Sequence, residues 1–255
     1  MSLGLKIRKF IYTALFNIDT LLNRKARTIV LCYHSISNNS HWRHSITKEM
    51  FISQLDYLRK HFDFISPNDL FNNERRGALI TLDDGYKDNL ELKELFSEYG
   101  ITPILFVIKD INNVKRGEID NDIQFLSELD IETLKNAGWT IGSHTQTHPN
   151  LTSLNAEELG REVSNPEELK YFSYPKGNYN DITIAAIKTA GYDMAFTMDD
   201  GFVNSKTDAY KIPRIGVDAS HDLNDFKASI SPSVIAFRRV VKSLFPKYLI
   251  ERTIQ

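Results

Sequence analysis

In the stretch Ala78-Leu79-Ile80-Thr81-Leu82-Asp83-Asp84-Gly85-Tyr86, two adjacent aspartates directly follow an apolar run. The run has the composition of a buried strand, and Asp-Asp-Gly most often forms the turn after one. Two carboxylates at the end of a buried strand are costly unless something cationic neutralises them. The stretch therefore predicts a strand whose carboxyl end carries acidic side chains that need a cationic partner.

A pair of histidines lies about sixty residues further along, in Ser143-His144-Thr145-Gln146-Thr147-His148-Pro149. Their four-residue spacing brings the two rings to one side of a helical turn or across a tight loop. Two imidazoles and one carboxylate fill three positions around a divalent metal and leave another open for water. The second aspartate can then take a proton from that water. Each motif alone is more often structural, but together they favour a mononuclear metal hydrolase.

Strand-like apolar runs alternate with helical patterns along most of the chain. The runs lie at residues 28–33, 78–82, 102–108, 140–142, 171–174, 194–197 and 211–217. Such alternation is typical of a parallel sheet. We therefore expect a single α/β domain, a distorted (β/α) barrel of about seven parallel strands. In such barrels the chemistry lies at the carboxyl ends of the strands, and these ends carry His34, Asp83, Asp84, Tyr174 and Arg214.

Three successive segments resemble the signature motifs of the polysaccharide deacetylases, carbohydrate esterase family 4. They are residues 81–86, 143–151 and 172–179. The front of the chain, at residues 31–36 and 51–58, is similar to the branch that deacetylates poly-N-acetylglucosamine. The resemblance covers roughly residues 28–218, and motifs in this order are highly specific.

The resemblance implies a role for each matching residue. Asp84, His144 and His148 match the metal ligands, Asp83 matches the general base that activates the attacking water, and His34 matches the acid that protonates the leaving amine. Two imidazoles and a carboxylate favour one zinc ion, with cobalt or nickel as alternatives. The implied enzyme is an N-deacetylase, a hydrolase of linear amide C–N bonds, that acts on an N-acetylated saccharide in surface-polysaccharide biosynthesis.

Two departures from the family pattern affect the third motif. The family has an arginine two residues before the motif's proline, where this chain has Ser173, and Arg214 is the candidate replacement, with an ordinary salt bridge as the alternative. The residue after the proline is Lys176 instead of an aromatic residue, and its backbone N–H remains a candidate oxyanion donor. Tyr174 is a further candidate for substrate or oxyanion contact. The missing arginine leaves open a catalytically inactive saccharide-binding barrel, and a carbohydrate O-acetyl esterase is the other alternative.

A second Asp-Asp-Gly occurs at residues 197–202, after another apolar run. From residue types alone, either pair of aspartates could bind the metal, and the order relative to the histidines favours Asp83 and Asp84. We expect Asp199 and Asp200 on a loop near the same mouth of the barrel, where they could contact sugar.

The two ends of the chain are basic. Residues 1–29 carry a charge of +5 and residues 233–255 a charge of +4, so the residues between them carry −11 within the total of −2. We expect a basic amphipathic helix over 1–27, the deacetylase-like barrel over 28–232, and a second basic amphipathic helix over 233–255. These helices either pack on the barrel or make peripheral contact with an anionic membrane, which would suit a lipid-linked saccharide.

Several other classes of protein are disfavoured. No stretch approaches the ~20 apolar residues of a membrane-spanning helix, and the first residues make a poor secretory signal. The prediction is a cytoplasmic chain, with the inner membrane face as a second possible location. The basic ends lack interleaved aromatic residues, so we expect no nucleic-acid partner. A single cysteine, Cys32, rules out an internal disulfide.

Overall fold

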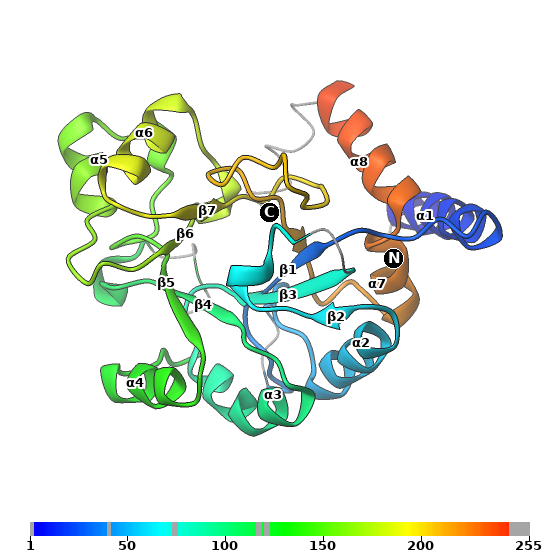
Figure 1. The fold of residues 1–255 in the computed structure, drawn as a ribbon, viewed down its shortest axis with the longest axis horizontal. Helices are drawn as coiled ribbons and strands as arrows, with labels where there is room; N and C mark the ends of the chain where they lie inside the picture. The colour runs from blue at the N-terminus through cyan, green and yellow to red at the C-terminus, as the bar shows by residue number, and fades with distance from the viewer. Residues whose placement is uncertain (1–2, 40–41, 73–75, 116–118, 120–122, 245–255) are drawn as a thin grey trace.

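The computed structural model describes residues 3–39, 42–72, 76–115, 119 and 123–244. A curled parallel sheet lies at its centre, with helices outside it (Figure 1). The strands are β1 (Ile29–Tyr33), β2 (Asp63–Phe64), β3 (Gly77–Leu82), β4 (Ile104–Val107), β5 (Thr140–Ser143), β6 (Tyr171–Ser173), β7 (Met194–Phe196) and β8 (Ile215–Gly216). Their order across the sheet is β7-β6-β5-β4-β3-β1-β8, and the short β2 pairs beside the start of β3.

The sheet curls towards a closed ring. Ile215 of β8 pairs with Leu31 of β1 at one edge. At the other edge Phe196 of β7 forms a parallel bridge with Ile212, which lies three residues before β8. The segment that leads into β8 thus links the two edges. The predicted distorted (β/α) barrel of about seven parallel strands in a single domain is confirmed, and the sequence pattern missed only the two-residue β2.

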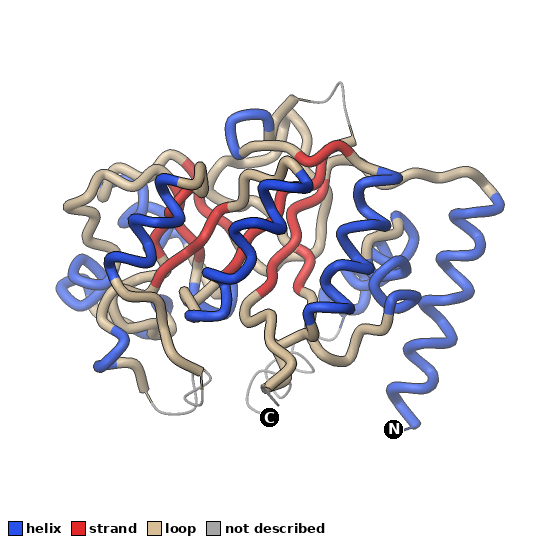
Figure 2. The backbone as a smooth tube through the Cα atoms, turned by 90° about the horizontal axis from the view of Figure 1, so that it is seen from below, coloured by secondary structure: helices blue, strands red, loops and turns tan. Residues whose placement is uncertain are grey.

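The helices form the outer layer of the molecule (Figures 1 and 2). They are α1 (Leu3–Leu21), α2 (Lys48–His61), α3 (Lys93–Tyr99), α4 (Glu128–Asn136), α5 (Ala156–Glu162), α6 (Asp181–Thr189), α7 (Leu223–Ser229) and α8 (Pro232–Leu244). Short 3-10 turns connect several of them: η1 (Pro67–Asp69), η2 (Lys87–Leu92), η3 (Ile111–Asn113), η4 (Leu151–Ser153) and η5 (Pro175–Gly177). No helix among the described residues is long and apolar enough to span a membrane.

Local signals explain where these helices begin and end. The Thr47 side chain accepts a hydrogen bond from the Met50 N–H and starts α2. Gly100, at φ 65°, ends α3 in the left-handed conformation that glycine adopts easily. Residues 87–99 form η2 followed directly by α3, and Asn89 of η2 turns inwards to donate a hydrogen bond to the carbonyl of His34 at 2.9 Å.

Apolar side chains fill both faces of the sheet. Along each strand, alternate residues point to opposite faces. Leu31, Ile80 and Leu105 belong to the cluster that packs against the α2, α3 and α7 helices. Their neighbours face the barrel interior, where the cluster contains Val30, Leu79, Ile104, Phe106 and Phe196. Because both faces are buried, the strands read as continuous apolar runs in the sequence.

Candidate active site

The alternation of side chains along the strands also places reactive side chains on the interior face of the barrel. On β1, Cys32 follows Val30 on the interior face, and His34 continues that face past the strand end. On β3, Thr81 and then Asp83 follow Leu79 in the same way. The carboxyl ends of these paired strands therefore bring a histidine and a carboxylate to one end of the barrel interior.

Asp83 forms a buried, bidentate ion pair with Arg214. The guanidinium nitrogens lie 2.6 Å from Oδ1 and 2.7 Å from Oδ2, and both residues are almost inaccessible to solvent. Arg214 also donates to the Ser173 hydroxyl at 2.8 Å and to Thr81. Burial opposes ionisation of Asp83, but Arg214 and His144 outweigh it and hold its pKa well below the usual range. Asp83 is therefore a fixed, ionised carboxylate.

Asp84, His144 and His148 form a second buried group directly beside Asp83. One ligand atom from each lies within 4.8 Å of the others. The Asp84 Oδ1 atom lies 3.5 Å from His144 Nε2 and 3.8 Å from His148 Nε2. The His144 Nδ1 atom is 2.9 Å from the carbonyl of Ser173, which fixes that nitrogen as the N–H donor and leaves Nε2 free of a proton towards Asp84.

This second group fits a divalent cation. Within the described residues, Asp84 Oδ1 is buried and accepts no hydrogen bond. Burial and the neighbouring charge of Asp83 raise the pKa of Asp84 to about 8. A bound divalent cation would lower the pKa of Asp84 again and hold its side chain as a carboxylate. One carboxylate and two imidazoles with converging lone pairs are a common ligand set for zinc.

The backbone that carries these ligands is strained at several positions. Asp84, at φ 75°, and Gly85, at φ 86°, form the turn after β3, while Thr145 and His148 have φ values of 71° and 58°. Left-handed conformations cost free energy in non-glycine residues and persist only where the surroundings enforce them. Strain at both ligand-bearing turns is therefore a property of the site.

Glu162, the last residue of α5, holds in place the turn of residues 144–148 that follows β5, which we call the histidine turn. Its Oε2 accepts hydrogen bonds from the backbone N–H groups of Gln146 at 3.0 Å and Thr147 at 2.9 Å. Its Oε1 accepts a third from the Thr147 hydroxyl at 2.6 Å. Sequence reasoning missed this residue, because nothing in the pattern of a short amphipathic helix marks a carboxylate that turns back to a loop 15 to 16 residues earlier.

His34 lies on the Asp83 side of the site. One of its nitrogens, an Asp83 oxygen and the Cys32 sulfur lie within 4.8 Å of one another. Burial raises the pKa of the Cys32 thiol well above its usual value, and Asp83 is already paired, so this trio is a poor metal site. Ring contacts with His44 at 4.9 Å and Trp42 at 5.6 Å enclose the imidazole. Burial and the charge of His44 lower the pKa of His34 to about 3.

Tyr174, in the third motif, does not lie where we expected it. Its ring is fully buried in the cluster beneath α5 and α6, its hydroxyl donates to the carbonyl of Tyr210 at 3.1 Å, and its backbone N–H donates to Phe196. Tyr174 is therefore a core residue and offers the substrate neither its hydroxyl nor its N–H. Lys176 is exposed, has a φ of 57°, and its charge contributes to the lowered pKa of His148.

Asp199 and Asp200, the second pair of aspartates, contact other side chains of the protein. Arg238 and Lys242 of α8 contact the buried Asp200 carboxylate at 2.7 Å and 2.8 Å. Asp199 is exposed and accepts a hydrogen bond from the Tyr179 hydroxyl at 2.6 Å. Asp200 therefore anchors the C-terminal helix, which corrects the expectation that it is available for sugar contact.

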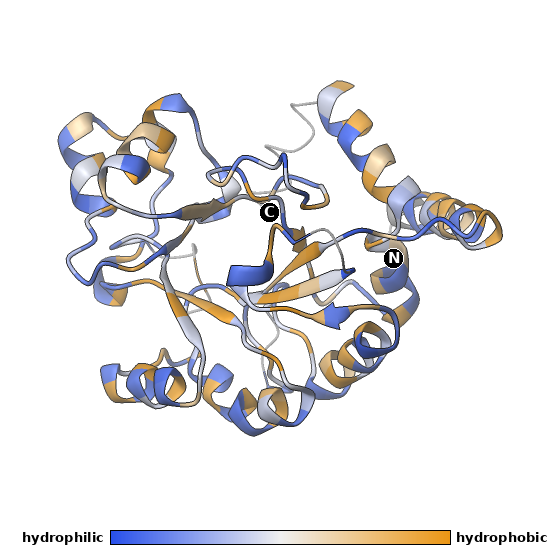
Figure 3. Cartoon of the chain, in the orientation of Figure 1, coloured by the Kyte–Doolittle hydropathy of each residue, from blue (hydrophilic) through white to orange (hydrophobic). Residues whose placement is uncertain are grey.

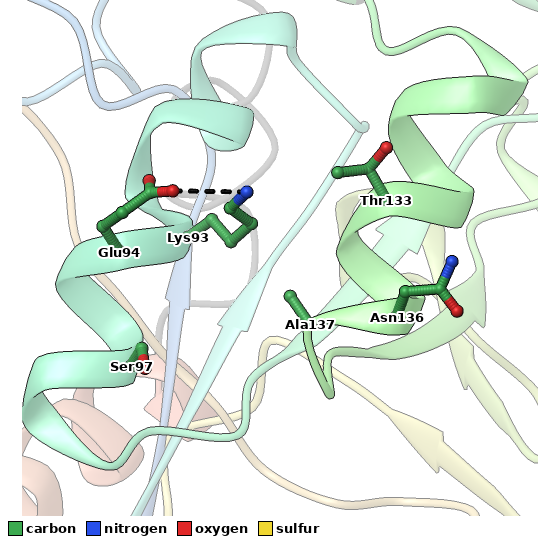
Figure 4. Close-up of a pocket in the computed structure, with 6 residues that line it drawn as sticks. All are labelled: Lys93, Glu94, Ser97, Thr133, Asn136 and Ala137. Carbon is green, nitrogen blue, oxygen red and sulfur yellow. Dashed lines mark ion pairs between the residues drawn. The ribbon is translucent and has the colours of Figure 1, made fainter.

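A hollow of about 500 Å³ between α3 and α4 is separate from these residues (Figure 4). Lys93 and Glu94, which form an ion pair at 3.2 Å, line it together with Ser97, Thr133, Asn136 and Ala137. Its lining contains no histidine and no buried carboxylate, and we assign it no function.

Comparisons with known proteins place this chain beside one family and its relatives. The family model described as polysaccharide deacetylase matches residues 72–195, which include Asp83, Asp84 and both histidines. The Bacillus subtilis (strain 168) protein named putative polysaccharide deacetylase YxkH is 25% identical over 225 residues, which cover 81% of this chain and 77% of that protein.

Solved structures share the fold at lower identity. The Streptococcus pyogenes deacetylase PplD, in complex with acetate, superposes with a TM-score of 0.67 at 19% identity, over 82% of this chain and all of that one. A de-N-acetylase from Aggregatibacter actinomycetemcomitans gives a TM-score of 0.66 at 16% identity, over 80% of this chain and 99% of that one. IcaB from Ammonifex degensii gives 0.60 at 20% identity, over 85% and 98%.

Proposed function

Because the chain belongs to the polysaccharide deacetylase family, we propose that it is a metal-dependent hydrolase that removes the N-acetyl group from an N-acetylated saccharide in surface-polysaccharide biosynthesis. One observation carries the proposal. The buried Asp84, His144 and His148 group lies directly beside a carboxylate, Asp83, that Arg214 keeps ionised.

The roles divide between the two neighbouring aspartates. Asp84, His144 and His148 would hold one divalent ion, with zinc expected. When bound, the ion supplies positive charge that polarises the acetyl carbonyl and makes water easier to deprotonate. Asp83 takes the proton from the attacking water, and the bidentate contact with Arg214 fixes the direction from which it does so. The exposed Lys176 adds positive charge at the rim and stays a candidate for oxyanion contact.

His34 delivers a proton to the leaving nitrogen. Amide hydrolysis requires this step because an amide anion is a poor leaving group. His34 is neutral at pH 7, so we infer that the proton it donates is the one that Asp83 removed from water. The oxygen of that water bonds to the acetyl carbon, the C–N bond breaks, and Asp83 returns to its ionised form. Acetate and a free amine are the products.

The catalytically inactive barrel is the weaker alternative. Its main support was the absence of an arginine at position 173. Ser173 instead donates its hydroxyl to Asp83 at 3.2 Å and accepts from Arg214. The two-point contact between Arg214 and Asp83 supports the proposal that Arg214 takes the place of the guanidinium that the family has two residues before the proline.

Metal stoichiometry tests the proposal most directly. We expect one divalent ion per chain in protein purified without chelator, no ion in Asp84→Ala, and one ion in Asp199→Ala, which changes an exposed carboxylate in the similar motif. Acetate release from N-acetylated oligosaccharides should follow the metal content. A wild-type chain that binds no zinc when zinc is supplied would refute the hydrolase. Acetate release from O-acetylated sugars alone would replace the amidase with an esterase.

A further inference from the structure

The two terminal helices pack against each other at one end of the molecule (Figure 1). Asp19 of α1 is buried and accepts hydrogen bonds from the Ser233 backbone N–H at 2.7 Å and from its hydroxyl at 2.6 Å. Tyr12 and Phe237 make an edge-to-face ring contact at 6.3 Å. Lys9 pairs with Asp222 at 3.2 Å, which ties α1 to the start of α7. These contacts fix which side of each helix faces outwards.

The outward side of this pair is apolar. Ten large hydrophobic residues are exposed among the described residues, and eight of them lie on or directly after the terminal helices. Phe10 is 74% exposed and Leu21 is 85% exposed. The others are Ile7, Ile18, Leu22, Val240, Val241 and Leu244. The α1 stripe runs the length of a helix of about 28 Å, and Figure 3 shows apolar positions along both helices at the edge of the molecule. We call this surface the terminal-helix face.

The charged residues around the terminal-helix face are almost all basic. Residues 3–27 and 232–244 contain nine lysines and arginines and a single carboxylate, Asp19, which is buried. Their charge is +8, whereas the whole chain carries −2. Lys6, Lys25, Arg27 and Arg239 are exposed. An apolar stripe with basic flanks is the pattern of helices that lie in the interface of an anionic bilayer.

We propose that the terminal-helix face binds the surface of an anionic lipid membrane. Three of the nine cations pair with carboxylates elsewhere in the chain, namely Lys9, Arg238 and Lys242, and the remaining ones still leave this surface basic. Charge favours a membrane over a second copy of the chain, because a symmetric dimer through this face would bring two basic surfaces together. Lipid acyl chains would cover Phe10 and Leu21, and anionic headgroups would neutralise the flanking lysines and arginines.

Membrane binding would place the candidate active site close to the bilayer. Arg238 and Lys242 of α8 contact Asp200, which follows the carboxyl end of β7. Asp83 and His144 follow the carboxyl ends of β3 and β5, so they lie at the same end of the barrel. A saccharide held at the membrane by a lipid would then be within reach. This last consequence depends on the proposed function, whereas lipid binding does not.

Vesicle flotation of the full chain tests the proposal. Vesicles of phosphatidylcholine with phosphatidylglycerol should carry the wild type upwards, and vesicles of phosphatidylcholine alone should carry much less. The double variant Phe10→Ser/Leu21→Ser should bind at least ~10-fold more weakly. The matched control is Leu129→Ser/Ile182→Ser, which changes two equally exposed hydrophobic residues on α4 and α6 and should bind like the wild type.

Three outcomes would overturn the proposal: negligible flotation of the wild type with both vesicles, equal flotation of Phe10→Ser/Leu21→Ser and wild type, or a wild-type dimer that this variant converts to a monomer without any lipid binding. Acetate release from a soluble oligosaccharide, measured in parallel, should not change in Phe10→Ser/Leu21→Ser. Flotation without acetate release in the wild type would reject the proposed function and leave the membrane surface supported.

Discussion

Arg214 and Asp83 are 131 positions apart in the chain, yet they form a two-point contact inside the barrel. The guanidinium also lies over the Phe106 ring at 5.5 Å, and its Nε donates to the carbonyl of Thr197 at 3.1 Å. A buried ion pair of this kind contributes little net stability, but removal of one partner leaves the other charged and unpaired. The ion pair between Arg214 and Asp83 therefore serves mainly to fix the position and the charge of Asp83.

A double-mutant cycle measures this coupling. We expect Arg214→Met to lower the free energy of unfolding by about 3 kcal/mol, because Asp83 is then buried without a counter-charge. Asp83→Asn/Arg214→Met should lose less than the sum of the two single variants. Urea unfolding in the presence of chelator gives the four values. Strictly additive losses would show that the two side chains do not interact in solution.

The pH dependence of kcat/KM tests the role of His34. The lowered pKa, about 3, means that the imidazole is already neutral across the neutral range. If the donated proton comes from the attacking water, activity should stay level as the pH rises from about 6.5 to about 9. An acid that must be protonated beforehand, with an ordinary histidine pKa, would instead lose about tenfold per pH unit over that range. His34→Ala should lower kcat strongly on amide substrates.

At the scale of elements, the histidine turn after β5 depends on α5. His144 and His148 are brought together by a turn that contains two left-handed residues, and the carboxylate of Glu162 satisfies two backbone N–H groups of that turn. Without this acceptor the turn would relax towards ordinary backbone angles and move His148 away from Asp84. Glu162 would thus act on a metal at this site through the backbone and not by contact.

Glu162→Gln should weaken zinc binding by about tenfold, because an amide cannot accept at both of its terminal atoms. Competition with a chromophoric chelator measures the affinity, and far-UV circular dichroism checks that the fold is kept. Glu157→Gln is the control, since Glu157 lies on the same helix, is exposed, and pairs only locally with Arg161. Equal zinc affinity in both variants would contradict the positioning role.

The elements show what local pattern can predict. Each of the seven expected strand runs overlaps an observed strand, because strands buried on both faces leave continuous apolar runs in the sequence. Gly100 and Gly191 lie just after α3 and α6, and both have the positive φ at which glycine commonly ends a helix. The two-residue β2 has no such run, since Asp63 is exposed and Phe64 only partly buried. Local pattern also could not show that η2 is tied to β1 through Asn89.

The residues of the candidate site also fall into two groups: those that a local motif could indicate, and those whose role depends on distant partners. Asp84, His144 and His148 could be named because each stands in a short motif next to a strand end, and the structure places them together. The contribution of Glu162 and the burial of Tyr174 depend on partners far along the chain. The repeated Asp-Asp-Gly motif at residues 197–202 shows the limit most clearly, because its residue types match those around Asp83 and Asp84, and its contacts with α8 are visible only in the structure.

At the scale of the whole molecule, polar contacts at each end hold the terminal helices to the barrel. Asp19 links α1 to the start of α8, and Asp200 fixes the far end of α8 beside the carboxyl ends of the strands. The predicted helix over residues 233–255 extends past the described residues, in which α8 ends at Leu244. The cytoplasmic location predicted from the sequence stays a prediction.

Asp200→Asn should release the end of α8 without loss of the metal. We expect faster hydrogen exchange of the amides of residues 236–244, because the ion pairs to Arg238 and Lys242 are lost, while exchange in β3 and β5 stays unchanged. Zinc stoichiometry should remain one. Asp199→Asn is the control and should alter neither. Loss of zinc in Asp200→Asn would mean that the second aspartate pair, and not α8, is coupled to the metal.

The position of Arg214 just before β8 has a consequence during synthesis. The proposed metal ligands and the proposed base are all present once residue 148 has been made, but the guanidinium that contacts Asp83 arrives only with the segment of β8, which pairs with β1. A nascent or truncated chain that lacks this strand could gather its ligands and still not hydrolyse a substrate. The appearance of activity on the ribosome would therefore report that the segment carrying Arg214 and β8 has joined the barrel.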